Sequence, residues 1–214
     1  MPRFFRQLHT KTGISPGTIE YTGERKVEKV TVSVLDYDEK NVDERQVESP
    51  EQCYQYRDTA GVSWINVNGL HDTDLLKNLG GHFGIHTLVL EDILNTHHRP
   101  KIEDHGEYLF VILKMLSYDD AEDRVIAEQV SIILGSTYVL SFQERGGDVF
   151  EPVRQRIRTA TGRIRSQGPD YLAYALVDAV VDHYLVVLEK LGEQIEDLEN
   201  SLVTEPTPEL LQEI

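Results

Sequence analysis

The sequence is poor in cysteine and in basic residues. One Cys in 214 residues, Cys53, excludes an internal disulfide and is typical of a reducing compartment such as the cytoplasm. A lone Cys is more often a small buried hydrophobe than a nucleophile. Only 21 Lys and Arg oppose 37 Asp and Glu, and the net charge of -16 disfavours nucleic acid and anionic lipid as partners. The composition therefore favours cations as binding partners.

Targeting and catalytic signatures are also missing. No basic-then-apolar leader opens the chain, and no run approaches the roughly 20 apolar residues of a membrane-spanning helix. As given, the sequence predicts a soluble protein. There is no Gly-rich phosphate loop, no G-x-S-x-G, no H-E-x-x-H and no C-x-x-C, so the motifs do not predict an enzyme.

The N-terminal half mixes strands with short helices. Alternation in "VTVSVLDY" (30–37) predicts a strand, and further strands are expected near 45–47 and in "GVSWINVNG" (61–69). Ser49 and Pro50 predict the start of a short helix. A helix within 71–84 is expected to end at Gly80 and Gly81, and Thr87 is expected to cap a helix over 88–95 that Arg99-Pro100 stops.

The second half predicts a meander followed by helices. "YLFVILKML", "VIAEQVSIIL" and "YVLSF" read as antiparallel strands, and apolar residues on both faces of the first require cover on both sides. The expected fold is α+β: an αβα sandwich with a central, largely antiparallel or mixed sheet, followed by long C-terminal helices. We divide the chain into a loosely ordered segment (1–26), a sandwich core (27–145), long helices with an acidic arm (146–205) and the start of a truncated helix (206–214).

The long helix expected from about 169 to 203 changes character along its length. "YLAYALVDAVVDHYLVVL" (171–188) is apolar nearly all round and is predicted to be buried. The second half carries one apolar seam that predicts a single partner helix. Its residues are Tyr184, Leu188, Leu191, Ile195, Leu198 and Leu202.

Two pairs of acids are candidate cation ligands. On the helix over 88–95, Glu91 and Asp92 share the face opposite the apolar residues, and oxygen ligands of this kind suit Mg²⁺ or Ca²⁺, although a solvated polar face is the alternative. Asp178 and Asp182 lie four residues apart on the apolar helix, so a cation, an arginine or a subunit interface is expected opposite them. Arg156 or Arg163 is the ion-pairing alternative.

Histidines and arginines form two further groups. A zinc site is one interpretation of two groups of histidines, His82 with His86, and His97 with His98 and His105. Their spacing does not match that of zinc ligands, so we expect exposed loop histidines. Such histidines can bind Co²⁺ or Ni²⁺ adventitiously. The arginines of "VRQRIRTATGRIR" suggest phosphate binding in isolation. In so acidic a chain, internal ion pairs with acidic helices are the better prediction.

Several segments in order resemble one family. "LVLEDILN", "RPKIEDHGEYLFVILKML", "EQVSIIL", "YVLSFQE", "GDVFEPVRQRIR" and "DYLAYALVDAVVDHYLVVLEKL" are similar to the cytoplasmic domain of CorA-type magnesium/cobalt transporters. The resemblance covers about Trp64 to Leu202. It implies a homo-pentameric, channel-like transporter of the cell membrane, with this domain on the cytoplasmic side and C-terminal membrane helices that this sequence lacks.

The resemblance also implies a regulatory cation site between neighbouring domains. The matching positions are Glu91 and Asp92, with Asp178 and nearby Asp182, and His97 is a weaker candidate beside them. Mg²⁺ is the implied ion, for which Co²⁺ or another divalent cation can substitute. The function implied is divalent-cation sensing; the alternatives are the cytoplasmic domain of a related zinc-efflux transporter and a metal-dependent enzyme.

Overall fold

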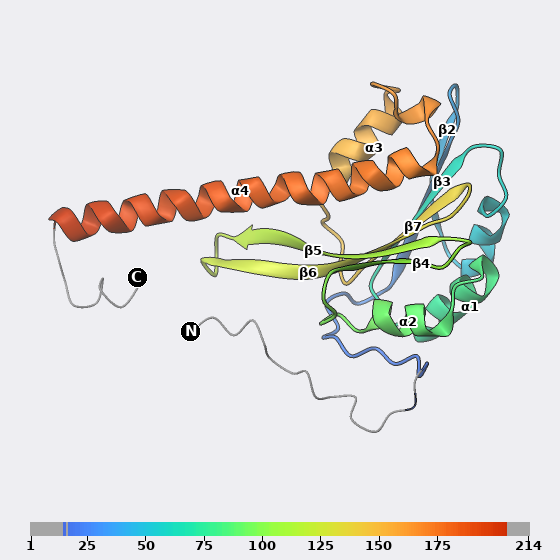
Figure 1. Cartoon of the computed structure of the whole chain (residues 1–214), viewed down its shortest axis with the longest axis horizontal. Helices are drawn as coiled ribbons and strands as arrows, with labels where there is room; N and C mark the ends of the chain where they lie inside the picture. Colours follow the sequence, from blue (N-terminus) through green and yellow to red (C-terminus); the bar gives the residue numbers. More distant parts are fainter. Residues whose placement is uncertain (1–14, 16, 205–214) are drawn as a thin grey trace.

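The computed structural model describes residue 15 and residues 17–204. In this part of the chain, seven strands form one sheet with helices on both faces (Figure 1). The strands are β1 (Thr31–Tyr37), β2 (Val42–Val47), β3 (Val62–Asn68), β4 (Lys101–Asp104), β5 (Leu109–Asp119), β6 (Arg124–Leu134) and β7 (Tyr138–Gln143). The helices are η1 (Pro50–Tyr56), α1 (Thr73–Phe83), α2 (Thr87–Leu94), α3 (Glu151–Arg158), η2 (Ile164–Ser166) and α4 (Pro169–Thr204).

The sheet is mixed, in the order β2-β1-β3-β7-β6-β5-β4. Strands β5, β6 and β7 form the expected antiparallel meander. The one parallel pair in the described sheet joins β3 to β7, with Ile65 opposite Leu140. The four-residue edge strand β4 was not anticipated, because its sequence "KIED" carries only one apolar residue.

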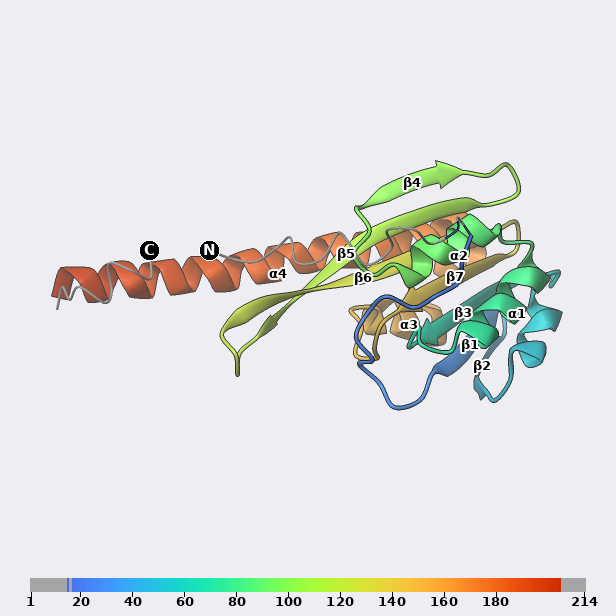
Figure 2. The ribbon, with the colours of Figure 1, turned by 90° about the horizontal axis from the view of Figure 1, so that it is seen from below.

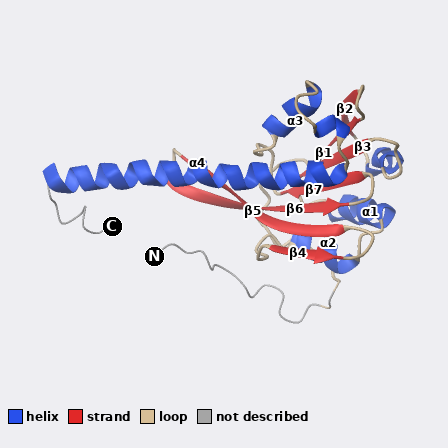
Figure 3. Ribbon diagram, turned by 45° about the horizontal axis from the view of Figure 1, so that its top comes forward, coloured by secondary structure: helices blue, strands red, loops and turns tan. Residues whose placement is uncertain are grey.

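Alternate residues of each central strand enter two separate cores. Ile65 and Val67 of β3 belong to the core under α1, α2 and η1, whereas Val62 and Trp64 belong to the core under α3 and α4. Figures 2 and 3 show the two helical layers on opposite sides of the sheet. The αβα sandwich is therefore confirmed. It arises because successive side chains of a strand point to opposite faces of the sheet, so apolar residues on both faces require helices on both sides.

The helix boundaries around α1 and α2 differ from expectation. Gly80 and Gly81 lie inside α1, which ends at Gly84 in the left-handed region with φ 71°. A Cβ on Gly80 would lie 2.7 Å from Leu90 Cδ1, so this glycine permits close packing of α1 on α2. The cap of α2 is His86, whose Nδ1 accepts a hydrogen bond from Leu88 N at 3.2 Å, and Thr87 is already helical.

The prediction that the first half of α4 is wholly buried was wrong. Leu172, Leu176 and Val180 are buried on the sheet, but Val181 is 49% exposed and Leu185 is 61% exposed. Only one side of α4 faces β5, β6 and β7, and α4 runs on past the sheet above the β5–β6 hairpin (Figure 1). Helix α3 also contacts α4, but Val181 and Leu185 remain exposed on the side away from the sheet.

The predicted seam of α4 is only partly covered. Tyr184 donates a hydrogen bond to Lys114 O on β5, and Gln194 Nε2 donates to Asp123 Oδ1 at the hairpin tip, at 2.6 Å. Ile195 remains 57% exposed. The hairpin therefore occupies part of the place expected for a partner helix, while the helix expected from residue 206 lies outside the described residues.

The segment leading into β1 contains no helix or strand from Gly17 to Val30. It runs along α2, where Thr22 N donates to Leu94 O at 3.3 Å. Most of the expected loosely ordered segment, residues 1–14 and 16, lies outside the described residues. The part that is described ties the chain entry to the helix that carries Glu91 and Asp92.

Contrary to the sequence-based expectation, one described helix is long and apolar enough to cross a membrane, by length and composition only. This is α4, whose most apolar 18-residue window has a mean hydropathy of 1.5. A third of that window, 33%, is buried inside the structure. The helix packs on the sheet through Leu172 and Leu176, as the core helix of a sandwich does.

Candidate divalent-cation site

Helix α2 presents the first acid pair because its apolar residues fix its orientation. Val89, Leu90 and Ile93 are buried in the core beneath the sheet. Glu91 and Asp92 are consequently turned toward the surface, where both side chains are half-buried. The expected separation of an apolar and an acidic face is confirmed.

Glu91 is engaged by the entry segment. Its Oε2 accepts a hydrogen bond from Gly17 N at 2.7 Å. This contact joins residues 74 positions apart in the sequence and holds the entry segment across α2. A cation at Glu91 would therefore act on the position of that segment as well as on the carboxylate.

Asp92 has two basic partners. Lys101 Nζ lies 2.7 Å from Asp92 Oδ2, and His98 Nε2 lies 3.3 Å from Oδ1. Burial opposes the charged form of Asp92, but the hydrogen bonds from His98 and Lys101 outweigh it and lower the pKa of this carboxyl. Lys101 was not expected as a partner of Asp92, because it reaches that carboxylate only from the unexpected strand β4.

The second acid pair lies on α4. Asp178 is half-buried and Asp182 is exposed, so the expectation of two buried acids was wrong: they lie toward the uncovered side of the helix. Within residues 17–204, neither forms an ion pair with Arg156 or Arg163. The charge of Asp178 and its hydrogen bond with the Tyr174 hydroxyl raise the pKa of Tyr174.

The two pairs are separated by the sheet. Helix α2 covers one face and α4 covers the other, as Figures 1 and 2 show. No group of three or more His, Cys, Asp or Glu side chains able to hold a metal occurs among the described residues of one chain. An ion bound by both pairs would therefore have to lie between neighbouring copies.

The histidines have mostly structural contacts. His82 stacks on Tyr54 with ring centroids 3.9 Å apart, and His86 caps α2. His105 stacks on Tyr108 at 4.9 Å. His97 is exposed, with Nδ1 3.5 Å from Thr96 Oγ1, and it lies next to His98 and the Asp92 cluster. The described geometry does not bring the histidines together as a zinc site.

The arginines of α3 and the following loop are largely used internally. Arg154 forms a two-bond ion pair with Asp148 at 2.6 and 2.7 Å, and Arg158 pairs with Glu44 at 2.6 Å. Internal ion pairs are thus present, and their acids lie on a loop, on β2 and, in the case of Glu151, on α3 itself. Cys53 is fully buried, and burial raises the pKa of its thiol to about 11, which makes it a poor nucleophile.

The fold is shared with two solved domains of other proteins. The soluble domain of CorA from Methanocaldococcus jannaschii matches with a TM-score of 0.63 and 18% identity, covering 85% of this chain and 68% of that one. The ZntB cytoplasmic domain from Vibrio parahaemolyticus matches with a TM-score of 0.58 and 11% identity, covering 78% of this chain and 64% of that one. At these identities the likeness concerns the fold alone, which is the αβα sandwich described above.

Sequence comparisons assign the family. The model for "CorA-like Mg2+ transporter protein" matches residues 59–214. The cobalt/magnesium transport protein CorA of Thermotoga maritima is 44% identical over 207 residues, which are 97% of this chain and 59% of that protein. A magnesium transporter of Saccharomyces cerevisiae, ALR1, is 28% identical over 65% of this chain and 16% of its own length. The chain belongs to the CorA-like Mg²⁺ transporter family, as its motifs predicted, and it spans little more than half of the Thermotoga relative.

Proposed function

We propose that this chain is the cytoplasmic, divalent-cation-sensing part of a transporter that moves Mg²⁺ and Co²⁺. Family membership supports the transport class. The proposed sensing residues are Glu91 and Asp92 on α2, Asp178 and Asp182 on α4, and His97 at the margin of the first pair.

The main support for this proposal is that the two acid pairs lie on opposite faces of the sheet. One chain cannot close a site from α2 and α4, because the sheet lies between them. Two copies packed with α2 of one against α4 of the next can do so. A ring of such contacts, a homo-pentamer in the whole protein, uses both faces of every copy.

The chemistry of sensing follows from charge. Facing carboxylates repel across an interface, and a divalent ion between them turns that repulsion into attraction. Such an ion favours the assembled state over the separated state, so it shifts the population toward the closed ring. Mg²⁺ retains water when it binds, which suits a site made of few carboxylates.

The remaining parts of the function belong to the whole protein. We place the pore in membrane helices beyond this sequence and this domain on the cytoplasmic side of the cell membrane. Ion selectivity would then be set in the membrane, whereas the carboxylates described here control opening. No catalytic step is required of these side chains.

A titration of the chain with Mg²⁺ tests the sensing site. Sedimentation velocity should show weak association without metal and increasing association as Mg²⁺ rises. In the Asp178→Asn, Asp182→Asn double variant the midpoint should move to roughly tenfold higher Mg²⁺, equivalent to about 1.4 kcal/mol. The matched control is Glu193→Gln with Glu196→Gln, which removes two exposed charges from the same helix.

Three results would count against the proposal. An equal rise of the Mg²⁺ midpoint in both double variants would show that the net charge of α4 matters and the position of Asp178 does not. An unchanged midpoint in both would show that neither matters. Association that is complete without metal would show that repulsion between acids does not govern assembly. Repeating the titration with Zn²⁺ and Co²⁺ tests the zinc alternative, which predicts tighter binding of Zn²⁺ that survives removal of the carboxylates.

A further inference from the structure

A basic cavity of about 450 Å³ lies beside β6, on the side where β7 has ended. It is lined by Lys26, Arg124, Val125, Ile126, Ala127 and Arg145. Three of these six residues are cationic and the other three are apolar, so no carboxylate belongs to the lining. That composition is unexpected in a chain with a net charge of -16.

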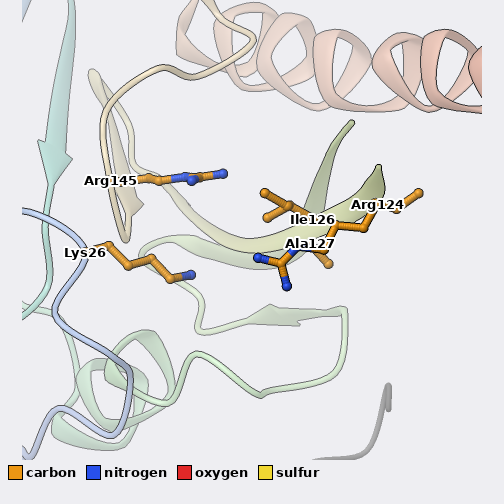
Figure 4. A pocket seen from close by; sticks show the side chains of 6 residues that line it. Lys26, Arg124, Ile126, Ala127 and Arg145 are labelled. Carbon is orange, nitrogen blue, oxygen red and sulfur yellow. The ribbon is translucent and has the colours of Figure 1, made fainter. Parts of the chain in front are cut away.

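The three cations come from three different segments. Lys26 belongs to the entry segment, Arg124 begins β6, and Arg145 follows β7. Figure 4 shows their charged ends directed into the same space. Arg124 has only a long, exposed contact with a carboxylate, 3.9 Å from Nη2 to Glu122 Oε2. An anion between the three cations would gain attraction from all of them.

Buried acids behind the cavity fix two of the cations. Lys26 Nζ lies 2.7 Å from Glu144 Oε2, and Arg145 Nε lies 3.0 Å from Glu128 Oε2, where each acid side chain is at most 4% exposed. Arg145 forms this ion pair through Nε, and the end of its guanidinium extends into the cavity (Figure 4). The acids therefore orient the cations and lie outside the lining.

The backbone of β6 adds neutral donors to the same space. Strand β6 pairs with β7 only from Val130 onward, so its first six residues have a free edge on that side. Gln129 N points to this edge, because it donates to Glu144 Oε1 at 3.3 Å. Residues two apart in a strand direct their N–H groups to the same side, which places the N–H groups of Ala127 and Val125 along the cavity.

We propose that this cavity binds a small phosphate-bearing anion, such as phosphate or pyrophosphate. Guanidinium and ammonium groups together with free backbone N–H groups are the donors that phosphate oxygens accept. The cations also protect the free edge of β6 from pairing with another strand. Protection of the edge alone would require charged side chains spread along the strand. Here the charged groups come from three segments and converge on one point, which suits a compact anion.

Calorimetric titration of the 214-residue chain with sodium pyrophosphate, in buffer containing EDTA, tests this site independently of divalent cations. We expect saturable binding to one site. Arg124→Gln should weaken it about tenfold, since this side chain is largely exposed and contributes little to folding. Arg163→Gln is the matched control, because it removes one exposed arginine outside the cavity, and it should bind as the wild type does.

Three outcomes would overturn the proposal. One is no saturable binding of phosphate or pyrophosphate at millimolar concentration. Another is an equal loss in the Arg124 and Arg163 variants, which would indicate diffuse electrostatic attraction. The third is binding to phosphatidylglycerol vesicles or to an acidic peptide without binding to the soluble anions, which would assign the cavity to a lipid surface or to a docked strand.

Discussion

The ammonium group of Lys101 bridges two carboxylates, with Nζ 2.7 Å from Asp92 Oδ2 and 2.8 Å from Glu103 Oε1. Asp92 is therefore already neutralised by a cation that belongs to the chain. A divalent ion that binds Asp92 has to displace this ammonium group or share the carboxylate with it. We therefore expect Lys101 to influence the concentration range in which the proposed site responds.

Replacing Lys101 with glutamine should make the response to Mg²⁺ more sensitive. With the resident cation removed, the midpoint of Mg²⁺-dependent association should fall by roughly threefold to tenfold, as expected for the loss of a partly buried competing ion pair. Sedimentation velocity at several Mg²⁺ concentrations measures it. Lys77→Gln is the control, since Lys77 pairs at 3.3 Å with the exposed Asp74, away from α2's acids. An unchanged midpoint in Lys101→Gln would remove Asp92 from the ligand set.

The uncovered side of α4 should matter for association and hardly at all for folding. Leu185 is 61% exposed, so Leu185→Gln should change the free energy of unfolding by less than about 0.5 kcal/mol. Leu176→Ala, at a fully buried position on the same helix, should cost roughly 2–5 kcal/mol. Urea unfolding of both variants checks this contrast. If Leu185→Gln unfolds as easily as Leu176→Ala, Leu185 is packed within the single chain.

The ion pair between Asp148 and Arg154 should make the fold sensitive to acid. Burial disfavours the Asp148 carboxylate, but hydrogen bonds from Arg154 and Gln143 outweigh it and lower the pKa of Asp148. A lowered folded-state pKa stabilises the protein above the unfolded value of about 3.9, and this stabilisation is lost as the pH falls through the folded value.

Asp148→Asn should therefore destabilise the protein by roughly 3 kcal/mol at neutral pH and flatten its stability profile below about pH 4. Thermal unfolding across that range measures both effects. Asp43→Asn provides the comparison, because the Asp43–Arg45 pair is about half exposed and should contribute at most about 1 kcal/mol. A parallel loss of stability in the Asp148 variant and the wild type at low pH would mean that another carboxyl controls acid unfolding.

Regular local patterns made most of the fold predictable. The alternation around Val32 and Val34 depends only on which side of the sheet is buried, and the structure confirms it. The C-terminal end of α1 could not be predicted in this way. Gly80 looks like a helix terminator in the sequence, but α1 continues through it, and the missing side chain leaves room for Leu90 of α2. Contacts between helices are not encoded in local spacing.

The acidic residues of the candidate site could be predicted from the sequence, but most of the groups that surround them could not. Helical periodicity alone places Glu91 and Asp92 on the outer face of α2. Their partners, Gly17 and Lys101, come from an irregular segment and from a four-residue edge strand, and neither carries a periodic signal. For α4 the apolar composition predicted burial all round, but composition does not reveal that only one side of the helix meets the sheet.

Neutralising Asp92 and Asp178 together in a full-length transporter tests the proposed function most directly. Loss of these charges weakens cation binding, and it also removes the repulsion that separates neighbouring domains, so resting activity changes little. The dependence on Mg²⁺ is the informative quantity. In the Asp92→Asn, Asp178→Asn variant, protection from proteolysis should no longer rise as Mg²⁺ is added, whereas the Glu193→Gln, Glu196→Gln control should be protected as the wild type is. If the Asp92 and Asp178 variant gains protection at the same Mg²⁺ concentration as the wild type, these carboxylates are solvated surface groups and the sensor lies elsewhere.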